Sequence, residues 1–97
     1  MRVVTPMRLV EYSNAHAQAR IPLLNWYAIA RKAEWGNLSD IKKDFNAVDY
    51  VGNNRYVFNI KGNDFRMIVL IIFKSKKVYI RFIGTHDEYN KIDATII

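Results

Sequence analysis

The sequence predicts an α+β fold in which helices from the first half of the chain cover one face of a sheet formed by the second half. Apolar residues recur at helical spacing as far as Phe45 and alternate beyond it. Turn signals such as Gly52-Asn53-Asn54 divide the second half into segments of strand length. With 97 residues, we expect a single domain spanning 1–97.

Composition narrows the class of protein. Hydrophobic residues make up 51% of the chain, which excludes a disordered protein, and the lack of cysteine excludes a disulfide scaffold or a thiolate site. The longest apolar run, Met67–Phe73, is too short to span a membrane, and no signal peptide is apparent at the start. The net charge of +6 indicates an anionic partner. We therefore expect a cytoplasmic protein.

The first predicted elements are a short strand and a helix. Met1–Val4 is β-branched and short. Thr5 and Pro6 follow as the N-cap and first helical residue, so we expect a helix from Met7 to about Gln18.

Two further helices complete the first half. Pro22 begins a helix that runs to Trp35, where a glycine follows. A shorter helix is predicted over Asp40–Phe45, capped by Asn37 or Ser39.

The second half is predicted to form strands and a last helix. The strands are Val48–Val51, Arg55–Ile60, Phe65–Phe73 and Val78–Ile83. Thr85 and Glu88 have capping-box spacing, which predicts a helix from His86 to about Ile92. The residues after Asp93 carry no clear pattern.

Hairpin registers divide the sheet into two faces, because directly opposed residues share a face. The turns pair Ile60 with Phe65 and Phe73 with Val78. One face is then entirely apolar: Tyr56, Phe58, Ile60, Phe65, Met67, Val69, Ile71, Phe73, Val78, Ile80 and Phe82. The helices of the first half must cover it.

The opposite face carries arginines. In this register Arg55 and Arg81 flank Leu70, and Arg66 lies about 13 Å from Leu70 along the central strand. Each could be an ordinary solvated charge. A central strand is nevertheless a poor place for an unpaired cation unless an anion meets it. A β-bulge would alter this arrangement.

The first turn of the last predicted helix adds two side chains suited to catalysis on this face. His86 and Tyr89 are three residues apart and lie on one side of a helix. Histidine is a natural general acid or base, and a helix start favours a phosphate. With the arginines they form a ribonuclease-like set, whereas His16 is isolated and predicted to be structural or solvated. No metal-ligand or cofactor motif is present, so the sequence indicates neither a metal ion nor a cofactor.

The chain resembles the HigB toxin family of the RelE/ParE superfamily. The resemblance rests on Arg55-Tyr-Val-Phe-Asn-Ile60, Gly62-Asn63, Arg66, Val78-Tyr-Ile-Arg81, Thr85-His-Asp-Glu-Tyr89, the Pro22–Tyr27 segment and Trp35. It covers nearly the whole chain in the expected order.

The resemblance implies a RelE-like α+β fold: a curved antiparallel sheet with helices on one face and a short C-terminal helix. It implies the toxin of a type II toxin–antitoxin system, a metal-independent endoribonuclease that cleaves mRNA and inhibits translation, usually in the ribosomal A site. The implied partner is a HigA-type helix-turn-helix antitoxin. We expect a monomeric toxin and a hetero-oligomeric toxin–antitoxin complex.

The resemblance also implies roles for residues. Arg66 and Arg81 would stabilise the phosphate, His86 would donate or accept a proton, and Tyr89 would stack on or orient the cleaved nucleotide. The glutamate that serves as general base in some relatives has no obvious counterpart. Asp49, Lys61 and His86 remain open for that role.

Further RNA contacts are predicted at Arg55, at Lys61 and at the basic turn of Lys74, Lys76 and Lys77. The lysine turn would equally serve as a solubilising hairpin tip. Two other functions remain: a non-catalytic RNA- or protein-binding toxin of the same fold, resembling a gyrase poison, and a ribosome-independent ribonuclease. A pure binding surface would not require Arg66, Arg81, His86 and Tyr89 together.

Overall fold

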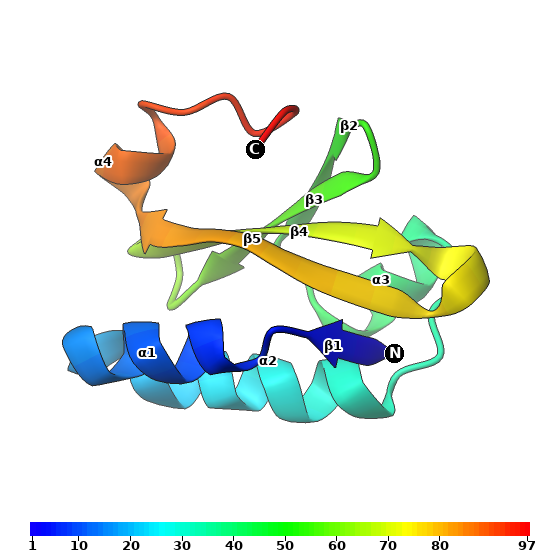
Figure 1. Ribbon diagram of the computed structural model, residues 1–97, viewed down its shortest axis with the longest axis horizontal. Coiled ribbons are helices and arrows are strands. Elements are labelled where there is room, and N and C mark those ends of the chain that lie inside the picture. Colours follow the sequence, from blue (N-terminus) through cyan, green and yellow to red (C-terminus); the bar gives the residue numbers. More distant parts are fainter.

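A computed structural model describes residues 1–97 and shows a curved sheet between two layers (Figure 1). The sheet has five strands in the order β1-β5-β4-β3-β2. The strands are β1 (Arg2–Val4), β2 (Val48–Gly52), β3 (Arg55–Ile60), β4 (Phe65–Ile72) and β5 (Lys77–Thr85). Helices α1 (Met7–Ala15) and α2 (Arg20–Lys32) cover one face, and the short helix α4 (His86–Tyr89) with the C-terminal segment lies over the other. The predicted α+β class and helix-covered sheet are confirmed.

The first helix begins at Met7 as predicted, but it ends at Ala15 rather than Gln18 and its cap differs from the predicted one. Helix α1 spans Met7–Ala15, and a 3₁₀ turn, η1 (Ala17–Ala19), joins it to α2. Thr5 has a φ of 58°, its hydroxyl donates to the Val4 carbonyl, and Pro6 occupies the N-cap position without a side-chain cap. The prediction of Thr5 as the N-cap is wrong, because Thr5 makes the turn out of β1 instead.

Helix α2 spans Arg20–Lys32 and ends before the predicted Trp35. Ala33 is extended, and its carbonyl accepts a hydrogen bond from the Met1 amino group. Trp35 is 3% exposed and donates to the Asp44 carboxylate at 2.8 Å. Burial of the indole therefore pulls the chain away from the helical path. Helix α3 (Leu38–Asp44) follows and is capped by Asn37, one of the two predicted caps.

The core lies between the helices and the sheet. Trp26 of α2 is 1% exposed and meets Phe58 of β3 edge-on, with ring centres 5.5 Å apart. The predicted covered-face residues of β3 and β4 are all buried: Tyr56, Phe58, Ile60, Phe65, Met67, Val69 and Ile71. All seven belong to the main core cluster, whereas Val57 and Ile68 between them belong to a separate one, which confirms which face the helices cover.

The β3–β4 register is as predicted, with Ile60 opposite Phe65, but the β4–β5 register is not. Val78 pairs with Ile71 rather than Phe73, because the chain leaves β4 in a 3₁₀ turn, η2 (Phe73–Ser75). A β-bulge between Ile68 and Val69 then leaves Arg81 without a partner. The bulge reverses the facing of the residues after it, so Ile83 packs toward the main core and Phe82 lies on the other face.

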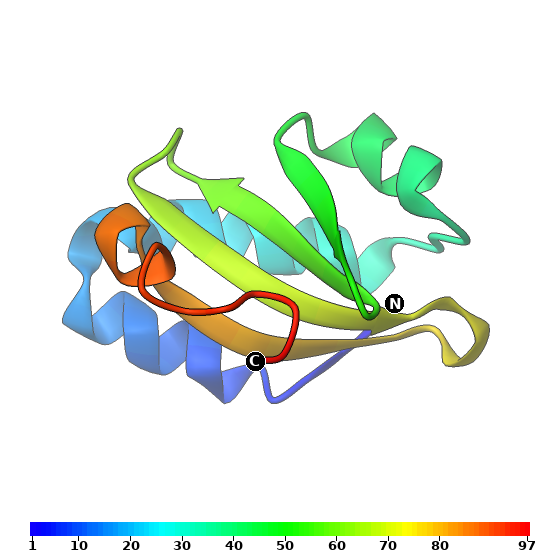
Figure 2. The ribbon, with the colours of Figure 1, turned by 90° about the horizontal axis from the view of Figure 1, so that it is seen from above.

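The edges and ends of the sheet were less predictable. Strand β1 pairs in parallel with β5, which is the single parallel contact in an otherwise antiparallel sheet. The capping box of Thr85 and Glu88 is present, but α4 ends at Tyr89 rather than Ile92. Beyond it the chain turns back across the face of the sheet opposite α1 and α2, here called the open face (Figure 2). None of the helices has the length and apolar character needed to cross a membrane.

Candidate functional site

The open face of the sheet consists of three rows of side chains across β3, β4 and β5. One row carries Asn59, Arg66 and Gly84 in register. The next is apolar, with Val57, Ile68 and Phe82, and the third has Arg55, Leu70 and Tyr79. Arg66 therefore lies at the α4 end of this face, and Arg55 lies nearer the other end.

Arg66 and Tyr89 are in direct contact. The guanidinium carbon of Arg66 lies 4.7 Å from the centre of the Tyr89 ring, which is a cation–π distance. Arg66 is half-buried, and its Nε is shielded from solvent without a hydrogen-bond partner. A shielded N–H without an acceptor is costly, so the site favours an anion that would accept from it.

Gly84, beside Arg66 in register, leaves room for the Phe82 ring. A Cβ placed there would lie 2.4 Å from the Phe82 ring and 3.1 Å from a Glu88 carboxylate oxygen. The absence of a side chain lets the Phe82 ring and helix α4 approach β5 closely. The floor beside Arg66 is therefore formed by the Gly84 backbone and the Phe82 ring that lies against it.

Helix α4 begins beside this floor and supplies His86. The Thr85 hydroxyl accepts from the Glu88 N–H at 3.2 Å, and the Glu88 carboxylate accepts from the Thr85 N–H at 2.8 Å. The Thr85 N–H chiefly, and the Thr85 hydroxyl to a smaller extent, lower the pKa of the Glu88 carboxyl. The His86 N–H donates to the Asp64 carbonyl at 3.3 Å, which ties α4 to the β3–β4 turn. His86 is thus placed on an anchored helix start.

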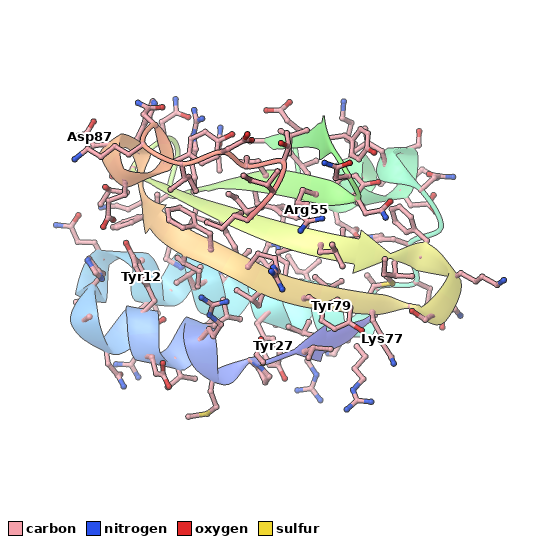
Figure 3. The ribbon with its side chains drawn as sticks, turned by 45° about the horizontal axis from the view of Figure 1, so that its top comes forward. Tyr12, Tyr27, Arg55, Lys77, Tyr79 and Asp87 are labelled. Carbon is pink, nitrogen blue, oxygen red and sulfur yellow. The ribbon has the colours of Figure 1, made fainter.

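Arg55 and Arg81 also meet, but not in the predicted way. Arg55 donates from Nε and Nη2 to the Ile97 carbonyl oxygen at 3.2 and 3.0 Å, and Arg81 donates from Nε at 3.3 Å. In register Tyr79, not Arg81, stands opposite Leu70, so the predicted flanking of Leu70 by two arginines is wrong. Figure 3 shows Arg55 on the open face close to the C-terminal segment.

The C-terminal segment, residues 90–97 and here called the strap, covers the middle of the open face (Figure 2). Ala94 is 9% exposed and forms a second apolar cluster with Val57 and Ile68. Asn53 donates from its side chain to the Thr95 carbonyl at 2.9 Å. The sequence carried no signal for this placement, because the strap is neither helix nor strand.

Arg81 owes its position to the bulge and to Arg8. The Arg8 guanidinium donates to the Ile80 carbonyl at 2.8 Å and to the Arg81 carbonyl at 3.4 Å. These carbonyls lie at the bulge, where regular ladder pairing is interrupted. Arg8 is a positioning residue that the sequence did not single out, because an arginine in a helix gives no sign of a distant carbonyl partner.

The three residues left open as general base differ in their surroundings. The Lys61 amine donates to the Gln18 side chain at 2.8 Å and lies 3.5 Å from the Asp64 carboxylate. Asp49 is exposed on β2 opposite Val57, which puts it on the open face. Lys61 is therefore engaged elsewhere, and Asp49 is about 10 Å from β4, two strand spacings away.

The lysine turn lies away from this end of the sheet. Lys74 and Lys76 belong to the connection between β4 and β5, and Lys77 begins β5 beside Arg2. Helix α4 follows the other end of β5, about 27 Å away along the strand. The lysines and Arg66 do not share a site, and a ligand touching both must run along the sheet.

His16 lies on the helical side and not at this face. Its ring stacks on Tyr12 at 4.0 Å and meets Phe65 edge-on at 6.1 Å. Burial, with a smaller contribution from Glu88, raises the pKa of Tyr12. The structural role predicted for His16 agrees with this packing. No group of three or more histidine, aspartate or glutamate side chains is placed to hold a metal ion.

Comparisons with known proteins agree with this fold. Residues 19–92 match a family model described as HigB toxin, the RelE-like toxic component of a toxin–antitoxin system. The chain is 29% identical over 97 residues to the mRNA interferase toxin HigB of Escherichia coli strain K12, covering 97% of this chain and 92% of that protein. It is 22% identical over 94 residues to an mRNA interferase HigB of Escherichia coli O6:H1, covering 95% of this chain and 91% of the relative.

Proposed function

The chain belongs to the HigB family of RelE-like toxins, and on that premise we propose that it is an endoribonuclease that cleaves mRNA and so inhibits translation and growth. The observation that carries the proposal is Arg66, half-buried over Tyr89 with a shielded Nε that has no acceptor. A phosphodiester supplies an acceptor of the right charge. The similarity to proteins named mRNA interferases supports RNA as its source.

The proposed reaction uses the RNA itself as nucleophile. The 2′-oxygen bonds to the adjacent phosphorus as its proton is removed, and the bond to the 5′-oxygen breaks as that oxygen is protonated. Arg66 stabilises the negative charge that grows on the phosphoryl oxygens. Tyr89 orients a nucleotide base while its ring holds the Arg66 guanidinium. No cofactor enters this scheme.

His86 is the proposed proton-transfer group. It stands at the start of α4, which is anchored by the capping box and by the bond to the Asp64 carbonyl. Asp49 is the better of the other two candidates for the second proton transfer, because it is exposed on the open face. Lys61 is the weaker candidate, since its amine is engaged by Gln18 and Asp64.

RNA would run along the open face from α4 toward the lysine turn. Arg81 and Arg55 lie along that path and would together contact one further phosphate. Lys74, Lys76 and Lys77 lie at its far end and would contact the backbone of messenger or ribosomal RNA. This basic length of surface supports binding of a strand longer than one nucleotide.

The family implies an antitoxin partner. We extend this to a HigA-type helix-turn-helix antitoxin, a monomeric free toxin, a hetero-oligomeric inhibited complex and action in the cytoplasm on the ribosomal A site. The net charge of +6 suits both an acidic antitoxin segment and ribosomal RNA. It does not discriminate between them.

The test is induced expression in bacterial cells with primer extension on a reporter message. Wild type is compared with His86→Ala and with Asp87→Ala, an exposed neighbour on the same helix. Growth arrest with cuts inside translated codons is expected for wild type and Asp87→Ala, and neither for His86→Ala at equal soluble protein. Arrest without cleavage would refute the proposal and favour a non-catalytic toxin.

A further inference from the structure

We propose that the strap, residues 90–97, is a built-in competitor of RNA: it occupies a phosphate seat formed by Arg55 and Arg81, so that the RNA strand and the docked strap exclude each other. This inference rests on the proposed function and adds a regulation to the same face. The relevant contacts are those made by the strap with the two arginines and with the apolar row between them and Arg66.

The first argument is the geometry of the seat. Three guanidinium N–H groups, two from Arg55 and one from Arg81, converge on one oxygen, that of the Ile97 carbonyl, at 3.0 to 3.3 Å. Two cations converging on one oxygen form a seat that suits an oxygen of a phosphodiester. The strap therefore fills a place whose donors would also bind a phosphate.

The second argument is that the strap is held by separable contacts. Apart from the arginines, its polar tether to the sheet is the bond from the Asn53 side chain to the Thr95 carbonyl at 2.9 Å. Its apolar contacts are made by Ala94, which is buried, and by Ile92 and Ile97, which are partly buried against Val57 and Ile68. The other residues of the strap are exposed or partly buried, so the strap belongs to the parts of a fold that open locally.

The third argument is its internal turn. The Thr95 N–H and hydroxyl donate to the Asp93 carboxylate at 2.9 and 2.6 Å, and the Ile96 N–H donates to the Asp93 carbonyl at 3.3 Å. These bonds lie within the strap and shape it without adding contacts to the sheet. They travel with the strap when it opens.

The consequence is a reduced apparent affinity for RNA. A protein whose binding-competent state is populated for a fraction of the time binds with its affinity reduced by that fraction. A strap that is closed nine-tenths of the time would weaken RNA binding about tenfold. Binding of RNA should in turn release the strap, because the coupling is reciprocal.

The test measures binding of a fluorescein-labelled, fully 2′-O-methylated single-stranded RNA decamer, which lacks the attacking hydroxyl. The variants are a chain that stops after Ile92 and the double variant Asn53→Gly, Thr95→Ala, which loosens the strap without exposing Val57 and Ile68. Glycine at position 53 tolerates its φ of 51°. Both are expected to bind several-fold more tightly than the full chain.

Two controls separate release of the strap from other effects. Asp87→Asn removes one negative charge from α4, which matches the loss of the Asp93 charge in the truncated chain. It should change the affinity for RNA much less than the truncation does. In an Arg55→Gln background the truncation should give a smaller gain, because half of the seat is gone. Equal gains in both backgrounds would contradict the proposed seat.

A direct view of the strap completes the test. In the full chain, saturating 2′-O-methyl RNA should move the backbone amide signals of Thr95 and Ile97 toward random-coil positions. Unchanged or weaker RNA binding in both loosened variants, or amides that stay in place, would overturn the strap proposal. If unmodified RNA is still cleaved in that case, the proposed function stands; if RNA is neither bound nor cleaved, both fail.

Discussion

The guanidinium carbon of Arg66 lies 4.7 Å from the centre of the Tyr89 ring. This contact joins the central strand β4 to helix α4, which are separated in the sequence by the whole of β5. It holds a cation in place before any anion arrives. A preorganised cation costs no rearrangement at the moment of reaction, which is the property that a phosphoryl-transfer site needs.

The Tyr89 ring should matter more than its hydroxyl for holding Arg66. Tyr89→Phe keeps the aromatic face and should retain most of the cleavage rate. Tyr89→Leu removes the face and should lower the rate about tenfold, given a cation–π interaction of about 1 kcal/mol plus loss of stacking on the nucleotide. The comparison is made by single-turnover cleavage at saturating protein. A rate for Tyr89→Phe as low as that for Tyr89→Leu would place the role in the hydroxyl instead.

Gly84→Ala should disturb the floor of the site. The added methyl group would meet the Phe82 ring at 2.4 Å and Glu88 at 3.1 Å. We expect a destabilisation of about 1–3 kcal/mol, measured by urea unfolding. Gly36→Ala is the matched control, because its nearest neighbour, Asp40, is at 3.5 Å, and it should change stability little. Equal effects of the two substitutions would argue against the close approach at Gly84.

The capping box should contribute measurably to the stability of α4. Thr85→Ala removes the hydroxyl that accepts from the Glu88 N–H. The expected loss is about 0.5–2 kcal/mol, measured as local amide exchange in α4 and as the unfolding midpoint. Ser75→Ala, at an exposed turn, serves as control. If exchange in α4 is unaffected, the capping box is not what anchors the helix start.

The capping box should also weaken in acid. The pKa of Glu88 is held below its ordinary value of 4.5, first by the backbone N–H of Thr85. A carboxylate with a lowered folded-state pKa stabilises the fold fully above its unfolded pKa and loses that contribution as the pH falls through the folded value. The stability difference between wild type and Glu88→Gln should therefore shrink on titration from about pH 6 to about pH 3. A difference that grows in acid would reverse the sign and contradict the assignment.

Arg8 should position Arg81 through the bulge. Arg8→Gln shortens the side chain that donates to the Ile80 and Arg81 carbonyls. We expect a loss of about 1 kcal/mol in stability and amide shifts at Ile80 and Arg81 by NMR. Arg20→Gln, an exposed arginine on α2, should cause neither. Shifts confined to α1 would show that Arg8 does not act on the bulge.

The face of the sheet that the helices cover could be predicted from the sequence, but the bulge in β5 and the β4–β5 register could not. Period-two alternation identified Phe58, Met67 and Val69 as core, because burial on one side of a sheet forces that pattern. The bulge at Arg81 leaves no mark in the alternation, since Phe82 and Ile83 are both apolar and either one can face the core. The register error at Val78 had a similar origin in the unmarked 3₁₀ turn after Ile72.

For the site, sequence reasoning brought Arg66 and Tyr89 to one face but misjudged the surroundings of Arg55 and Arg81. The misjudgement has two physical causes: the bulge shifts Arg81, and the strap reaches Arg55 through contacts that depend on tertiary packing alone. Arg8 was missed because a helix pattern marks an arginine as solvent-facing and does not reveal a distant carbonyl. Gly84 was missed because the ring it accommodates was assigned to the other face.

The central claim is that Arg66 stabilises the phosphate while the RNA supplies its own nucleophile. The most direct measurement is cleavage of a 5′-labelled message, free and on translating ribosomes, by purified wild type and Arg66→Ala, with analysis of the new 3′ ends. The account predicts 2′,3′-cyclic phosphate ends and a rate at least about a hundredfold lower for Arg66→Ala with the fold intact. Free 3′-hydroxyl ends, or an Arg66→Ala variant that cleaves at the wild-type rate, would contradict it.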